Sequence, residues 1–118
     1  MRFEVRLGTE IIGFSELECG DPPMGVASGR LVRTAAYASV QAYCVKYRDN
    51  WVSPPALSVC LVGGVAIECS GGVQIVDFGP ELGDAGIQIH LNGIINPPYG
   101  ELFAHHVEAY KNQFAKSG

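Results

Sequence analysis

Three residues near the C-terminus have the spacing of a helical metal site. Glu101, His105 and Glu108 are separated by four and then three positions, so on one helix their side chains share a face. Two carboxylates and an imidazole in this arrangement can ligate a divalent metal ion. A metal site inside a helical bundle needs a second such helix, and the aromatic helix expected earlier in the chain carries none. We therefore interpret the set as a solvated outer helix face and predict no metal and no cofactor.

The neighbouring histidines do not alter this prediction. His105 and His106 are adjacent, so they point about 100° apart around a helix and do not form the His-Glu-x-x-His zinc signature. Elemental analysis of protein purified without an affinity tag is expected to find no stoichiometric zinc, iron or manganese. A bound metal whose occupancy falls in the His105→Ala variant would contradict this expectation.

Catalytic combinations are available but have no fixed spacing. His90 could pair with Asp77 or Glu68 as an acid and base, and Ser70 or Cys69 could act as a nucleophile. Any globular chain with three histidines offers such combinations. The glycine pairs near residues 63–64 and 70–72 precede apolar runs instead of a helix, so they indicate hairpin turns and not a phosphate loop. We predict that the protein is not an enzyme.

The four cysteines are Cys19, Cys44, Cys60 and Cys69, and their spacings match no zinc pattern. Charged residues interrupt the first apolar run, which is not typical of a secretion signal, so we expect a cytoplasmic protein. Cytoplasmic cysteines usually behave as small buried hydrophobic residues. A cross-strand contact between Cys60 and Cys69 remains open at this point.

The segment from Gly13 to Gly29 contains three carboxylates, two consecutive prolines and four glycines between apolar runs. This composition predicts an ordered, acidic connection on the surface. A second group of acids follows later in the chain. Such groups would suit a basic partner, and ordinary solvated loops are the alternative. The predicted partner-binding residues are Glu16, Glu18, Asp21, Asp77, Glu81 and Asp84.

The chain of 118 residues has the usual size of one domain, which we assign to residues 1–118. With 47% hydrophobic residues it can form a packed core without disulfides. Its formal net charge is −4, and its basic residues are scattered, which argues against nucleic acid as a ligand. No apolar run approaches the length of about 18 residues that a membrane span requires, so no membrane partner is expected.

The elements that must position these residues follow from their periodicity. Alternating runs predict an N-terminal hairpin over residues 3–14 and a third strand over residues 26–32. Helical spacing predicts one helix from Thr34 to Asn50 and another from Tyr99 to Ala115, the second anchored by Phe103, Val107, Tyr110 and Phe114. Between them lie four short β-prone runs, 57–62, 65–69, 73–78 and 87–91. The expected fold is α+β, a mainly antiparallel sheet of about six to seven short strands with two helices packed on it.

One resemblance adds to this interpretation. The residues from Gly13 to Glu18, followed by those from Asp21 to Gly29, resemble small immunity-type proteins of bacterial toxin and contact-dependent inhibition systems. The resemblance implies a non-catalytic protein that neutralises a cognate toxin by binding it directly. It implies no particular site residue.

Two other classes of function stay open. A small enzyme or ligand-binding domain would place a pocket between sheet and helices, lined by Tyr37, Tyr43, Tyr47 and His90. A structural subunit of a larger assembly is the third alternative. The acidic composition and the absence of a catalytic motif favour the protein-binding module.

Overall fold

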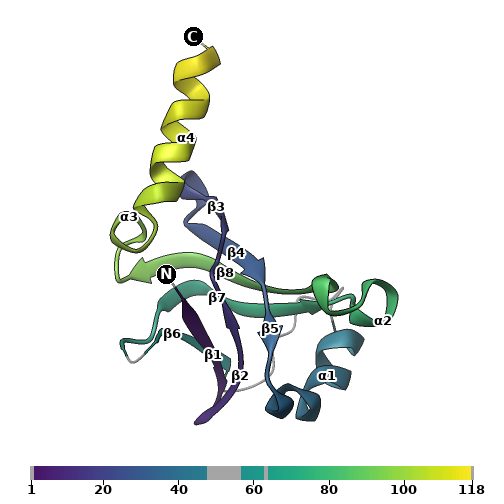
Figure 1. The fold of residues 1–118 in the computed structure, drawn as a ribbon. Helices are drawn as coiled ribbons and strands as arrows, with labels where there is room; N and C mark the ends of the chain where they lie inside the picture. Colours follow the sequence, from purple (N-terminus) through teal and green to yellow (C-terminus); the bar gives the residue numbers. More distant parts are fainter. Residues whose placement is uncertain (1, 48–56, 63, 118) are drawn as a thin grey trace.

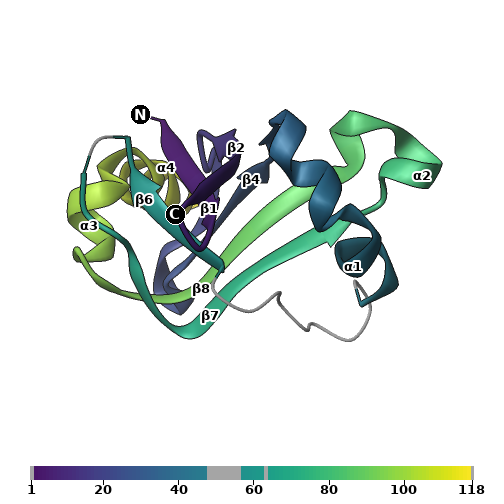
Figure 2. The same ribbon diagram turned by 90° about the horizontal axis from the view of Figure 1, so that it is seen from below.

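The computed structural model describes residues 2–47, 57–62 and 64–117. Within them the chain forms two antiparallel sheets of four strands each, with four α-helices (Figures 1 and 2). The first sheet has the order β5 (Val32–Arg33), β2 (Glu10–Ser15), β1 (Phe3–Leu7), β6 (Leu57–Leu61). The second has the order β3 (Cys19–Asp21), β4 (Val26–Arg30), β8 (Ile87–Asn96), β7 (Glu68–Asp77). The α+β class and the antiparallel pairing are confirmed, whereas the predicted sheet of about six to seven strands with two helices is wrong in its numbers of strands and helices.

The N-terminal hairpin forms as the alternating pattern predicts. β1 pairs with β2 from Phe3 opposite Ser15 to Leu7 opposite Glu10. Gly8 occupies the turn with φ +63°, a conformation that glycine adopts without strain. Phe3 and Val5 on β1 face inwards together with Ile12 on β2, so the hydrophobic face of the hairpin fixes its register.

β7 is one continuous strand where the sequence predicts two. The Ser70-Gly71-Gly72 segment indicates a hairpin turn in the sequence, but in the structure it lies inside β7. The pairing of β7 with β8 shifts register between Cys69 and Gly72 and then resumes up to Asp77 opposite Ile87. Gly72 has φ +85°, so the glycines accommodate an irregularity in a continuous strand. The predicted meander is therefore wrong over this region.

The core lies between the two sheets, whose strands cross steeply (Figure 1). The first sheet contributes side chains from β1, β2 and β6, and the second contributes side chains from β4, β7 and β8. Inner positions of β8 alternate with outward ones, as a half-buried strand requires. The main contributors are Phe3, Val5, Ile12, Val59, Ala27, Ile75, Ile89 and Leu91.

Both predicted helices are interrupted. After Thr34 the chain forms a 3₁₀ helix, η2 (Ala35–Ser39), and then α1 (Gln41–Lys46), and residues 48–50 of the predicted helix lie outside the described residues. The C-terminal helix is split at Phe103 into α3 (Tyr99–Leu102) and α4 (Ala104–Ser117). Phe103 leaves the helical conformation, with φ −129° and ψ 49°, as its ring enters the core.

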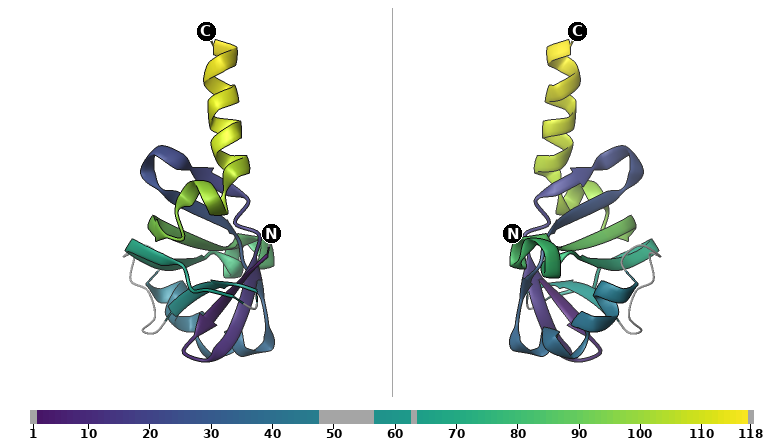
Figure 3. Two further views of the ribbon diagram at one scale, coloured as in Figure 1. Left: turned by 90° about the vertical axis from the view of Figure 1, so that its left-hand side faces the viewer. Right: turned by 90° about the vertical axis from the view of Figure 1, so that its right-hand side faces the viewer.

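α4 does not lie along a sheet as predicted. It projects away from the body of the protein and contacts β3 and the 3₁₀ helix η1 (Pro22–Met24) near its base (Figure 3). Phe103 is fully buried, whereas Val107 and Tyr110 are half-buried, and the side chain of Phe114 lies outside the described residues. The anchor of this region is therefore the residue that precedes α4. No helix in the described part of the chain is long and apolar enough to cross a membrane.

Candidate functional site

The acidic segment after β2 is ordered by one buried residue. Leu17 has no solvent exposure, and its backbone N–H donates to the Ser15 hydroxyl at 3.1 Å. Its φ of +46° lies in the left-handed region, which a non-glycine residue rarely adopts. Because Leu17 points inwards, Glu16 and Glu18 on either side of it are exposed. The prediction of a surface connection over residues 13–29 is therefore wrong in part: the segment contains β3 and parts of β2 and β4, and Leu17 and Ala27 lie in the core, while its three carboxylates are exposed.

Glu18 is held in position by the neighbouring strand. Its Oε2 accepts a hydrogen bond from the backbone N–H of Arg30 on β4 at 3.0 Å. Its Oε1 lies so close to Gly29 that a Cβ at that glycine would overlap it. The carboxylate is thus exposed to solvent but fixed against the backbone, which lowers the entropy lost when it binds another group.

Two hollows open on either side of Glu18. The first, which we call the Arg2 hollow, has a volume of about 320 Å³. The guanidinium of Arg2 lies over the ring of Phe14 there, with Cζ 4.2 Å from the ring centroid. The second, the His106 hollow, has a volume of about 180 Å³ and lies against α4. The Arg2 hollow is lined by Arg2, Phe14, Ser15, Glu16, Glu18, Arg30 and Val32, and the His106 hollow by Glu18, Gly20, His106, Ala109, Tyr110 and Gln113.

Three of the six predicted partner-binding residues lie in this region. Glu16, Glu18 and Asp21 are all exposed, and none of them forms an ion pair with another described residue. Exposed carboxylates without a cation keep their full charge available to a partner. Asp21, on β3, lines neither hollow.

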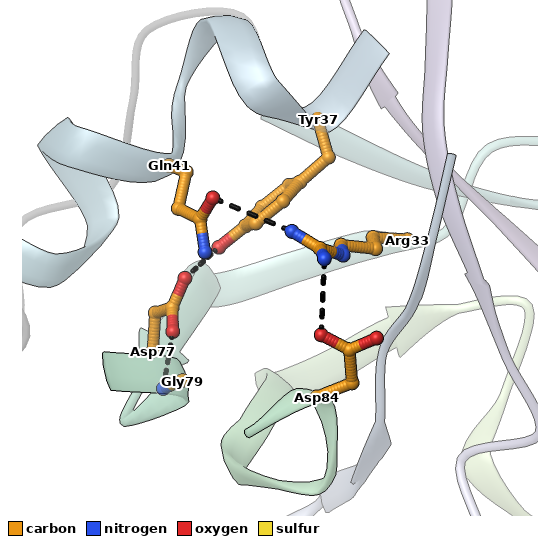
Figure 4. A network of polar contacts seen from close by, with 6 residues as sticks. All are labelled: Arg33, Tyr37, Gln41, Asp77, Gly79 and Asp84. Carbon is orange, nitrogen blue, oxygen red and sulfur yellow. Dashed lines mark hydrogen bonds and ion pairs between the residues drawn. The ribbon is translucent and has the colours of Figure 1, made fainter. Parts of the chain in front are cut away.

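The other three predicted partner-binding residues, Asp77, Glu81 and Asp84, differ in exposure. Asp84 forms an exposed ion pair with Arg33, 3.2 Å from Oδ1 to the guanidinium, and Glu81 is exposed on α2 (Gly79–Leu82). Asp77 is fully buried at the end of β7, so its prediction as a surface residue is wrong. Its Oδ2 accepts a hydrogen bond from the Tyr37 hydroxyl at 2.6 Å, and its Oδ1 accepts one from the Gly79 N–H at 2.6 Å (Figure 4).

The hydrogen bonds of Asp77 stabilise the core and do not form a surface site. Burial, together with the hydrogen bond to Asp77, raises the pKa of Tyr37 far above its ordinary value. Burial also raises the pKa of the adjacent Cys44 thiol to about 11, so this cysteine is an inert buried thiol near neutral pH. From the sequence, Asp77 belongs to the β-prone run 73–78 and is grouped with the exposed acids of the following turn, whereas in the structure its carboxylate points inwards to Tyr37.

The predicted ligand pocket of three tyrosines and a histidine does not assemble. Tyr37 is buried with its hydroxyl engaged, while Tyr43 and Tyr47 pack on each other with ring centroids 4.6 Å apart. His90 lies between Ser28 and Gln74 in the strand register. None of these four residues lines either hollow.

The catalytic pairs considered from the sequence are separated by the sheet. Asp77 lies opposite Ile87, and Gln74 lies opposite His90, so Asp77 and His90 occupy opposite faces of the sheet. Glu68 pairs with Asn96, about 20 Å along β8 from His90 at 3.4 Å per residue. Burial lowers the pKa of His90. The Ser70 hydroxyl donates to the Gly93 carbonyl at 3.2 Å.

The three residues with the spacing of a helical metal site do not lie on one helix. Glu101 belongs to α3, whereas His105 and Glu108 belong to α4, because the chain leaves the helix at Phe103. Among the described residues no three or more histidine, cysteine, aspartate or glutamate side chains form a group suited to a metal. Each of the four cysteines is a free thiol, and the strand partners of Cys60 are Glu4 and Ala66 while Cys69 pairs with Ile94.

Sequence reasoning missed the role of His106. Its ring is buried against Phe103 and its Nδ1 lies 3.0 Å from the Tyr99 hydroxyl oxygen. The helical pattern does not single it out, since its neighbour His105 is exposed one position away. The sequence feature that accompanies this contact is Gly20, because a Cβ there would overlap both His106 Nδ1 and the Tyr99 hydroxyl.

The fold and the site thus define a small α+β protein of two crossed sheets with an acidic surface next to a projecting helix. Comparisons with protein-family models, with curated proteins and with solved structures found no significant match to this chain.

Proposed function

We propose that the protein is a non-catalytic binding module that neutralises a cognate bacterial toxin by direct contact, acting as an immunity protein. The resemblance in residues 13–29 supports this class, and the acidic net charge of −4 suits a basic partner. The observation that carries the proposal is the placement of Glu18. It is an exposed carboxylate, fixed on β4, that forms the shared wall of two adjacent hollows.

The binding surface that we propose comprises the two hollows and Asp21. Glu16 and Glu18 line the hollows, where a lysine or arginine of the partner can bind a carboxylate while its stem packs on Val32. Asp21 adds charge at the margin of the surface. Glu81 and Asp84 lie outside the hollows and contribute to the long-range attraction of a basic partner.

The test uses the product of the gene beside that of this chain, purified as the toxin. The Glu16→Lys/Glu18→Lys/Asp21→Lys variant is expected to lose binding because it places three cations opposite a basic surface. Removal of a carboxylate that is desolvated on binding should weaken the binding free energy by about 2–5 kcal/mol. Removal of a carboxylate at the margin should chiefly change the association rate and its salt dependence. Calorimetry or surface plasmon resonance over a range of salt concentrations measures both effects.

Two control variants sharpen this test. Glu10→Lys/Glu68→Lys/Glu108→Lys changes the net charge by the same amount at exposed sites outside the hollows, and it should retain most of the affinity. Gly29→Ala leaves the charge unchanged but displaces the Glu18 carboxylate, and it should weaken binding. Circular dichroism checks that each variant is folded. If the folded Glu16/Glu18/Asp21 variant binds and protects as well as the unmodified protein, the proposed surface is wrong.

A further inference from the structure

At the base of α4 a buried histidine packs against the body. His106 is 7% exposed, and its ring stacks on Phe103 with centroids 4.8 Å apart and an angle of 2° between the planes. Its Nδ1 reaches the hydroxyl of Tyr99 on α3. Beyond this region α4 projects into solvent (Figure 3), so His106 lies where a small change in attachment moves the whole helix.

The hydrogen bonds around His106 indicate which nitrogen of its neutral ring carries the proton. The Tyr99 hydroxyl lies 2.9 Å from the Val26 carbonyl, which can only accept, so the single hydroxyl proton is donated there. The Tyr99 oxygen must then accept a proton from His106 Nδ1, 3.0 Å away. In the neutral ring this leaves Nε2 without a proton. Nε2 is buried and has no hydrogen-bond partner among the described residues.

Gly20 and Phe103 pack closely against the His106 ring. Gly20 on β3 approaches both His106 Nδ1 and the Tyr99 hydroxyl more closely than any residue with a Cβ would allow. Phe103 occupies one face of the ring. A proton added to Nε2 in the docked arrangement is therefore buried, and among the described groups only the nearby Leu17 and Glu18 carbonyls favour it.

The ionisable groups around His106 come from each element that contacts it. On α4 they are His105, with ring centroids 4.2 Å apart, and Tyr110 in the same hollow. Tyr99 lies on α3, Glu18 lies in the same hollow before β3, and Asp21 on β3 acts on Tyr99. Burial, and then the proximity of His105, lowers the pKa of His106, while the Leu17 and Glu18 carbonyls oppose this less strongly. Neutral His106 is the form that the docked helix favours.

We propose that His106 is a proton-operated latch, whose neutral ring holds the first turns of α4 on β3 and whose protonation releases α4 from the body. Release leaves the sheets intact, because α4 contacts the rest of the protein mainly at α3, β3 and η1. It also opens the His106 hollow, since α4 supplies His106, Ala109, Tyr110 and Gln113 to its lining. This device does not depend on the identity of any partner.

The sign of the pH dependence follows from the lowered pKa of His106. The docked arrangement is fully retained above the ordinary histidine pKa of 6.5, where the ring is neutral in both states. It is lost as the pH falls below 6.5 towards the lowered pKa. Each unit by which the pKa of docked His106 lies below 6.5 corresponds to an approximately tenfold smaller ratio of docked to released helix at acidic pH.

NMR spectroscopy of the whole chain between pH 8 and pH 5 tests the latch. Long-range ¹⁵N–¹H spectra should show the proton of neutral His106 on Nδ1, and its titration midpoint should lie below 6.5. The protection factors of the α4 amides after His106, which are corrected for the intrinsic pH dependence of amide exchange, should fall as His106 is protonated. Site-resolved spectra separate this event from the titration of His90 and His105.

Three variants distinguish the latch from general acid instability. His105→Gln, at the adjacent exposed position, should keep the pH-dependent protection of α4. His106→Gln should abolish that dependence, and Tyr99→Phe should lower α4 protection already at pH 8. If α4 protection in the unmodified protein does not follow the His106 titration, or if His106 titrates at or above 6.5, the latch is wrong. The measurement on the unmodified protein decides the question even if a variant does not fold.

Discussion

Replacing Phe103 with alanine is expected to lower the free energy of unfolding by about 3–5 kcal/mol, the usual cost of truncating a fully buried phenylalanine. Phe103 has no solvent exposure and joins three parts of the protein. Its ring lies 5.6 Å from that of Phe3 on β1, 5.0 Å from that of Tyr99 on α3, and stacks on His106 of α4. The alanine variant leaves a cavity where these elements meet.

Denaturant unfolding followed by circular dichroism measures this effect, and Glu108→Ala is the matched control. Glu108 is exposed on α4, so its truncation should change the unfolding free energy by less than about 0.5 kcal/mol. Val107→Ala should fall between the two, because Val107 is half-buried. Equal effects of Phe103→Ala and Glu108→Ala would show that the burial of this region is wrongly assigned.

The second large effect is expected from Tyr37→Phe, which should cost about 2–3 kcal/mol of unfolding free energy. The variant keeps the ring in the core but removes the hydroxyl that donates to Asp77 Oδ2 at 2.6 Å. Hydrogen bonds to charged groups contribute about 1.5–3 kcal/mol, and leaving a buried acceptor without its donor adds a desolvation cost. Asp77 is fully buried, so water does not replace the lost donor without local rearrangement.

Tyr47→Phe provides the control for this experiment. Tyr47 is half-buried at the end of α1 and packs on Tyr43, so its ring contact is preserved when the hydroxyl is removed. Its effect should stay within about 0.5 kcal/mol. If Tyr37→Phe and Tyr47→Phe unfold at the same denaturant concentration, the Tyr37–Asp77 hydrogen bond does not stabilise the fold as we infer.

The position of Asp77 also affects how binding experiments are designed. A charge reversal at this residue would destabilise the core and mimic a loss of binding. Glu16 and Glu18 are exposed, so substitutions there test the surface without this complication. For this reason the proposed interface is tested at the acidic segment before β3.

Local patterns in the sequence determined several elements directly. The alternation of residues 3–14 predicts the N-terminal hairpin, because side chains on a strand point to opposite faces with a period of two. The acids of residues 16–21 are predicted to be exposed, and Glu16, Glu18 and Asp21 are exposed. These predictions succeed because the relevant interactions lie between residues that are close in the chain.

The tertiary structure decided the features that depend on distant residues. The pairing of β7 with β8 on both sides of Gly71 and Gly72 makes one strand where local turn signals predict two. The hydroxyl of Tyr37, 40 positions away in the sequence, donates to Asp77 in the core. Tyr99 reaches the Val26 carbonyl across 73 positions, and Gly20 leaves the space in which Tyr99 and His106 meet. The hydrophobicity of a side chain and its neighbours in the sequence determine its local conformation. Its burial and its protonation state depend instead on the distant atoms that supply a hydrogen-bond donor, an acceptor or free space. Those atoms come together only when the sheets pack.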